Sequence, residues 1–135
     1  MSIPRPRPHR GMRHIALFIE HFDATVTFYT ELLGFAVEWQ PDADNVYLCS
    51  GCDNLALHRA PAGERPLAGQ RLDHLGLIVQ AAEDVDAWHD FLKSHGTAIK
   101  AAPRTHRDGA RSFYFLDPDG NLVQIIHHPP IAESY

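Results

Sequence analysis

Two histidines with similar neighbours stand 60 positions apart, at His14 and His74. Each opens a short apolar run with the composition of a β-strand, His14–Ile19 in the first case and His74–Val79 in the second. A neutral imidazole is a common metal ligand, and two symmetry-related strands can direct two imidazoles at one point. A lone strand histidine is more often a hydrogen-bonded structural residue, but two at equivalent positions reinforce each other. The pair therefore indicates a candidate divalent-metal site.

The elements that follow these histidines repeat as well. Each run leads into apolar residues spaced i, i+3, i+6 and i+7, which predicts a helix with one buried face. These residues are Val26, Tyr29, Leu32 and Leu33 in the first copy and Val85, Trp88, Phe91 and Leu92 in the second. Gly34 and Gly96 follow the two patterns, as is typical where a helix ends in the left-handed conformation. Short strands are expected next, near residues 36–39 and 97–100.

The second halves of the two copies align without gaps. The segment Tyr47–Leu55 matches Tyr114–Leu122, and each predicts a strand, a turn and a strand. The turn Asp117–Gly120 has strong turn chemistry, with proline presetting φ and glycine accepting a positive φ. A β-α-β-β-β unit thus occurs twice, which predicts an α+β fold built of two tandem βαβββ modules.

The chain length of 135 residues, 44% of them hydrophobic, suits one domain with a real core. We expect a paired βαβββ domain over residues 12–130, with module one at about 12–61 and module two at about 72–130. Residues 1–11 hold three Pro and three Arg and are expected to form a flexible tail. Residues 131–135 are expected to form a short C-terminal tail.

Charge and hydropathy exclude some classes of partner. The formal charge of −5, from 12 Lys and Arg against 17 Asp and Glu, argues against binding nucleic acid, which requires concentrated positive charge. No apolar run approaches the roughly 20 residues that span a bilayer. The first ten residues also lack the apolar segment of a secretory signal. We therefore expect no membrane partner, and a cytoplasmic location.

Three segments show a resemblance to a known family. They are Arg13–Leu17 followed by Phe28–Phe35, then Leu72–Leu77, and finally Ser112–Leu122. Over most of residues 12–130 the chain resembles the vicinal oxygen chelate superfamily, which includes glyoxalases, bleomycin- and fosfomycin-resistance proteins and extradiol dioxygenases. The resemblance implies that the two modules form a curved mixed-sheet cleft, usually with a divalent metal at its base. It also implies a homodimer, with the cleft formed either within one chain or between two.

The resemblance carries the metal-ligand positions of the superfamily onto His14, His74 and Gln124. A glutamate is usual at the last of these, and a carboxamide oxygen leaves the full charge of the cation in place, so weaker metal binding is expected. The metal itself is left open among Zn, Ni, Mn and Fe. A fourth ligand is sometimes taken from module one, where the repeat alignment places Leu57 and a one-residue slip at a β-bulge would place His58. His58 is then either a cleft-lining or metal-adjacent residue, or an ordinary strand histidine.

Other candidate site residues follow from the same resemblance. Tyr114 matches a tyrosine that faces the substrate region in the fosfomycin-resistance branch, so it is a candidate hydroxyl donor or else an ordinary strand aromatic. Arg104 and Arg107 lie in the expected loop Pro103–Ala110, where that branch gathers groups for a phosphonate. Tyr47 is a candidate aromatic contact for a bound small molecule.

Two main functions remain open at this stage. The first is a divalent-metal-dependent enzyme that chelates a small oxygenated substrate, as a lyase, a dioxygenase or a transferase. Gln124 replaces the acidic residue that glyoxalase and extradiol chemistry each use at that position, so no single reaction is selected. The alternative is a metal-free protein that binds and sequesters a small molecule, such as a drug, in an aromatic cleft, as in the bleomycin-resistance branch. A third possibility is a domain that serves only oligomerisation or regulation.

Overall fold

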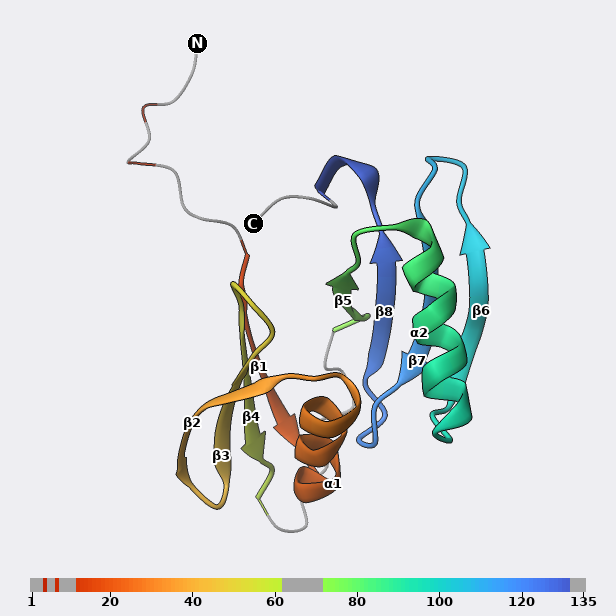
Figure 1. Cartoon of the computed structure of the whole chain (residues 1–135). Coiled ribbons are helices and arrows are strands. Elements are labelled where there is room, and N and C mark those ends of the chain that lie inside the picture. Colours follow the sequence, from red (N-terminus) through yellow and green to blue (C-terminus); the bar gives the residue numbers. More distant parts are fainter. Residues whose placement is uncertain (1–3, 5–6, 8–11, 62–71, 132–135) are drawn as a thin grey trace.

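Two four-stranded mixed sheets form the frame of the molecule (Figure 1). The computed structural model describes Pro4, Arg7 and residues 12–61 and 72–131. Module one contains β1 (His14–Ile19), α1 (Phe22–Thr27), the π-helical turn η1 (Phe28–Leu32), β2 (Ala36–Asp42), β3 (Asn45–Cys49) and β4 (Asn54–Arg59). Module two contains β5 (Leu75–Ile78), α2 (Ala82–Ser94), β6 (Ile99–Thr105), β7 (Arg111–Leu116), β8 (Leu122–His127) and the 3-10 turn η2 (Pro129–Ile131).

The two sheets have the same topology. Their strand orders are β1-β4-β3-β2 and β5-β8-β7-β6. The first strand of each module pairs in parallel with the last, and the remaining pairs are antiparallel. The predicted α+β fold of two tandem βαβββ modules is confirmed.

Each sheet is covered by helix on one face only. On β1, Leu17 and Ile19 are buried whereas His14, Ala16 and Phe18 are exposed, which is the two-residue alternation of a strand with one packed face. On β7 the buried aromatic residues Phe113 and Phe115 alternate with Tyr114, and α2 packs across β6, β7 and β8 (Figure 1). We call the helix side of each sheet its covered face and the other side its uncovered face.

The predicted helix ends are found in both modules. Gly34 follows η1 with a φ of 77°, and Gly96 follows α2 with a φ of 81°. Only glycine takes this left-handed conformation without a Cβ penalty, so each glycine lets the chain leave its helix for the next strand.

Side chains of the covered faces join the two modules. The hydroxyl of Tyr29, in η1, donates to Oδ2 of Asp117 in the β7–β8 turn at 3.0 Å. The backbone N–H of His21 donates to Asp119 in the same turn at 2.6 Å. Phe28 also packs against Phe115, with ring centroids 6.1 Å apart. The modules therefore share one continuous core.

The gapless alignment of the repeats is wrong by one residue in the last strands. In module one Ala16 pairs with Ala56, and in module two Gly76 pairs with Gln124. Ala16 and Gly76 each lie two residues after the repeated histidine, so Ala56 is the equivalent of Gln124, not Leu57. The reason is turn length, because four residues connect β3 to β4 and five connect β7 to β8.

The expected loop over residues 103–110 is also shorter than predicted. The strand β6 continues to Thr105, and Arg104 pairs with Ser112 on β7. Pro103 is accommodated because β6 is an edge strand and the register shifts between Ala101 and Arg104. The predicted tails, residues 1–11 and 131–135, lie almost wholly outside the described residues. No helix within the described residues is long and apolar enough to cross a bilayer.

Candidate functional site

The uncovered face of the first sheet carries His14 at one end. Ala16 and Phe18 follow at two-residue intervals along β1, so they share this face. The strand register places Asn54 beside His14 and Ala56 beside Ala16. Ala16 is exposed and Ala56 is 1% exposed, and we call this pair of short side chains next to the imidazole the alanine floor.

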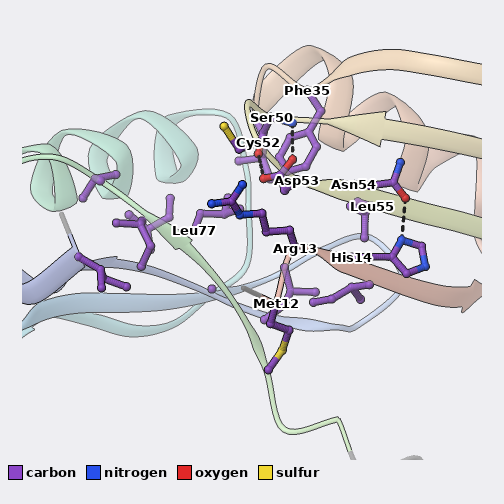
Figure 2. A pocket seen from close by; sticks show the side chains of 18 of the residues that line it. Met12, Arg13, His14, Phe35, Ser50, Cys52, Asp53, Asn54, Leu55 and Leu77 are labelled. Atoms are coloured by element: carbon purple, nitrogen blue, oxygen red, sulfur yellow. Dashed lines mark hydrogen bonds between the residues drawn. The ribbon is translucent and has the colours of Figure 1, made fainter. Parts of the chain in front are cut away.

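Asn54 holds the ring of His14. Its Oδ1 lies 2.7 Å from Nδ1 of the imidazole, and Figure 2 shows the two side chains facing each other. The Nδ2 group of Asn54 donates in turn to Glu38 at 2.5 Å. Sequence reasoning missed both partners, since only the strand register brings Asn54 beside His14.

His58 lies at the opposite end of this face from His14. It pairs with Phe18, and the two ring centroids are 6.2 Å apart. Its Nδ1 lies 2.6 Å from Oδ1 of Asn45. It lies four positions after Asn54 on β4, about 13 Å along the strand. His58 therefore shares the uncovered face with His14 but does not neighbour it.

Tyr47 borders the alanine floor from the side. It pairs with Ala56 and stacks on Trp39, with ring centroids 5.3 Å apart and an interplanar angle of 17°. Trp39 is 60% exposed and Phe18 is 61% exposed. Large aromatic surface is therefore open to solvent next to the floor.

The uncovered face of the second sheet brings together His74, Gln124 and Tyr114. Gln124 pairs with Gly76 on one side and with Tyr114 on the other, and it is 8% exposed. The rings of His74 and Tyr114 meet edge to face, with centroids 5.3 Å apart and an interplanar angle of 90°. Nδ1 of His74 lies 2.5 Å from a carboxylate oxygen of Asp73.

The donor set of these two faces suits a divalent cation. Both His14 and His74 have Nδ1 engaged by a side-chain oxygen, which leaves Nε2 of each ring as the ligating atom, the usual arrangement of a metal-bound histidine. The carboxamide oxygen of Gln124 is a hard donor that suits a divalent metal. Within the described ranges, no three His, Cys, Asp or Glu side chains lie together as a metal-binding group.

The two halves of this set stand on separate sheets. His14 belongs to the first sheet, whereas His74 and Gln124 belong to the second. The hydrogen bonds that join the modules, as far as the described residues show them, lie on the covered side. The candidate ligands of one chain therefore stand on two different sheets.

Comparison with known proteins agrees with this architecture. The sequence profile of the Glyoxalase/Bleomycin resistance protein/Dioxygenase superfamily matches residues 11–125. The chain belongs to this superfamily. Members of the superfamily named for fosfomycin resistance and for dioxygenase activity are among its relatives, which places the chain in the vicinal oxygen chelate group.

Relatives within the superfamily are distant. The fosfomycin resistance protein FosX of Listeria innocua is 28% identical over 127 residues, covering 85% of this chain and 87% of that protein. The 3-methylcatechol 2,3-dioxygenase of Pseudomonas putida is 27% identical, and the chain spans only 41% of its length. Lactoylglutathione lyase from Agrobacterium tumefaciens has a similar structure, with a TM-score of 0.74 at 19% identity over 90% of this chain and 96% of that one. Such a likeness shows the superfamily fold alone.

A polar cluster extends the uncovered face of the second sheet beyond Tyr114. Ser112 lies two residues before Tyr114 on β7 and is 2% exposed. Its hydroxyl is 2.8 Å from Nε2 of His106, and Nδ1 of that ring is 3.4 Å from Arg104. Sequence reasoning named Arg104 but missed Ser112 and His106, although the alternation of Ser112 with Tyr114 was a usable signal. Arg107 lies in the exposed turn after β6 and is outside this cluster.

A cavity of about 760 Å³ lies between the modules (Figure 2). Its walls come largely from the covered faces, with Ile15 and Leu55 on one side and Leu77 and Ile125 on the other. His14 reaches its rim, but His74, Gln124 and Tyr114 are not among the residues that line it. The cavity is therefore distinct from the candidate ligands on the second sheet.

Proposed function

We propose that this chain is a divalent-metal-dependent enzyme that acts on a small oxygenated substrate, with His14, His74 and Gln124 as metal ligands. The observation that carries this proposal is that the two imidazoles make equivalent contacts. Each stands on an uncovered face with Nδ1 bound to a side-chain oxygen and Nε2 left for a metal. Relatives named for resistance to fosfomycin and for oxidation of 3-methylcatechol support an oxygen-bearing substrate.

We further propose that the site is completed in a homodimer. The modules of one chain meet through their covered faces, so their uncovered faces remain available. A second copy can place the first sheet of one chain against the second sheet of the other. His14 then joins His74 and Gln124 of the other chain in a shared cleft.

Other side chains of the two faces have roles in this proposal. A bound metal would polarise adjacent substrate oxygens as a Lewis acid. The Tyr114 hydroxyl, next to Gln124, would donate a hydrogen bond to a substrate oxygen. Arg104 would hold an anionic substituent, and Arg107 would add positive charge at the rim. Tyr47 and His58 would contact the body of the substrate.

Metal content tests this proposal directly. Protein purified without chelator or affinity tag is expected to contain about one divalent ion per chain, measured by elemental analysis. Replacing Gln124→Glu adds a negative charge beside the cation, so Zn²⁺ affinity is expected to rise about 10- to 100-fold. Absence of metal, together with no Zn²⁺ binding to the native protein, would contradict the enzyme proposal.

A second function is favoured by the open aromatic surface. Trp39 and Phe18 are each about three-fifths exposed, and Tyr47 stacks on Trp39 beside the alanine floor. A planar molecule lying on this floor would bury aromatic surface from both protein and ligand. This second candidate is a metal-free binding protein that sequesters a planar compound.

Fluorescence of Trp39 distinguishes the two functions. In a Trp88→Phe background, bleomycin is expected to quench Trp39 to saturation if the second function holds, and a chelator should leave the affinity unchanged. Tyr47→Ala should then weaken binding more than about tenfold, because the planar ring of the ligand loses an aromatic side chain on which it stacks. A lack of quenching at high bleomycin concentration would remove this candidate.

A further inference from the structure

The orientation of the Asn54 amide is determined by Glu38. Nδ2 of Asn54 donates to Oε2 of Glu38. An ionised carboxylate only accepts hydrogen bonds, so the amide must present its NH₂ group to Glu38. Its oxygen is consequently directed at His14, and Oδ1 lies 2.7 Å from Nδ1 of the ring.

This orientation determines which ring nitrogen of His14 carries hydrogen. The amide oxygen only accepts, so Nδ1 of His14 must be the donor. In a neutral imidazole one nitrogen carries hydrogen and the other carries a lone pair. Nε2 of His14 is therefore left with the lone pair that a metal requires.

Glu38 reaches Asn54 because it sits at a β-bulge. Val37 pairs with Leu48 and Trp39 pairs with Tyr47, so two steps along β2 match one step along β3. Glu38 is the extra residue, and a bulge commonly re-aims the side chain that it inserts. Its carboxylate passes over β3 and meets Asn54 at the start of β4.

We propose that Glu38 and Asn54 are positioning residues that fix His14 in the tautomer with hydrogen on Nδ1. Neither residue is a ligand. The effect of these two residues on metal binding rests on the proposed function. Their effect on the His14 tautomer does not, because it is expected in the protein without metal. His74 has a separate arrangement, because its Nδ1 contacts the adjacent carboxylate of Asp73 directly.

The tautomer can be measured without metal by ¹⁵N NMR of the histidine rings at about pH 8, above the usual pKa of histidine. His14 of the native protein is expected to show hydrogen on Nδ1, assigned by its loss in His14→Ala. Glu38→Gln should keep this state, because the new amide can still offer an oxygen to Asn54. Glu38→Lys offers only donors, so it should turn the Asn54 amide and move the hydrogen of His14 to Nε2. Glu31→Lys makes the same change of charge on η1 and should have no effect.

Zn²⁺ titration of the same variants gives the second readout. Asn54→Leu is expected to weaken binding about 10- to 100-fold, the usual cost of losing a partner that orients a ligand. Glu38→Lys should weaken it more than Glu31→Lys does. An unchanged His14 tautomer in both Glu38→Lys and Asn54→Leu would contradict the positioning role of Glu38 and Asn54. If the tautomer shifts as expected while no protein binds Zn²⁺, this positioning role holds and the enzyme proposal fails.

Discussion

Replacing either His14 or His74 with alanine is expected to lower Zn²⁺ affinity more than about 100-fold. Loss of a residue that merely orients a ligand costs about 10- to 100-fold, so loss of the ligand itself should cost more. Folding should be little changed for His14→Ala, because an exposed side chain contributes within about 0.5 kcal/mol. His21→Ala is the matched control, since His21 is exposed and its structural contact is made by the backbone. Native-like affinity in either ligand variant would contradict the assignment.

Mixing the two variants tests where the site is formed. If the cleft lies between chains, a dimer of His14→Ala with His74→Ala has one site lacking both histidines and one site with both. Zn²⁺ binding should therefore return when the two inactive proteins are mixed and allowed to exchange subunits. If the cleft lies within one chain, each chain still lacks a ligand and mixing restores nothing. Native mass spectrometry of the mixture confirms that exchange has occurred.

Replacing Asp117→Ala is expected to destabilise the protein by about 3 to 4 kcal/mol. Asp117 is 4% exposed and accepts four hydrogen bonds. Two come from backbone groups of its own turn, one from the side chain of Asn121 and one from Tyr29 of the other module. Truncation leaves buried donors without a partner and removes one hydrogen bond between the modules. Chemical denaturation measures the loss, and a change below about 1 kcal/mol would show that the turn does not depend on this carboxylate.

The same carboxyl should make stability depend on pH. Burial raises the pKa of Asp117, although hydrogen bonds from Asn121 and Tyr29 act in the opposite direction. A raised pKa means that the folded state binds a proton more tightly than the unfolded chain. The resulting stabilisation is full below the usual carboxyl range and is lost as pH rises through the folded pKa. The stability difference between native protein and Asp117→Ala is therefore expected to be larger near pH 4 than near pH 7.

A double-mutant cycle isolates the contact between modules. Burial and the nearby Asp117 carboxylate raise the pKa of the Tyr29 phenol, so this group is a neutral donor near pH 7. Tyr29→Phe removes the donor alone and should cost about 1.5 to 3 kcal/mol, as for hydrogen bonds to charged groups. Because the two residues are in contact, the double variant should lose less than the two single losses added together. Simple additivity would show that the pair does not couple the modules.

The repeat could be recognised in the sequence because distinctive residues stand at equivalent positions of the two copies. The histidines and the helix-ending glycines mark both modules, the D-P-D-G turn marks the second, and the structure has the same order of elements. Strand register was harder to predict. A difference of one residue in turn length moves the equivalent of Gln124 from Leu57 to Ala56, and periodicity does not report such a shift.

The residues of the candidate site were also predicted only in part. Residues of recognisable chemical type, such as His74 and Tyr114, were found from sequence and lie in contact. Asn54 and Glu38 were not found, because their role depends on cross-strand neighbours and on a bulge in β2. Arg104 was expected in a loop over residues 103–110, whereas β6 continues to Thr105, since an edge strand tolerates Pro103 at a register shift.

Ala56 has a consequence for the coordination number of the proposed centre. It occupies the place in module one that Gln124 occupies in module two, and its methyl group provides no donor atom. Catalytic metal sites typically have three protein donors and an open position, whereas structural sites are closed by a fourth. Because Ala56 supplies no donor, the proposed centre is one protein ligand short of closure, and the open position lies on the side of the alanine floor.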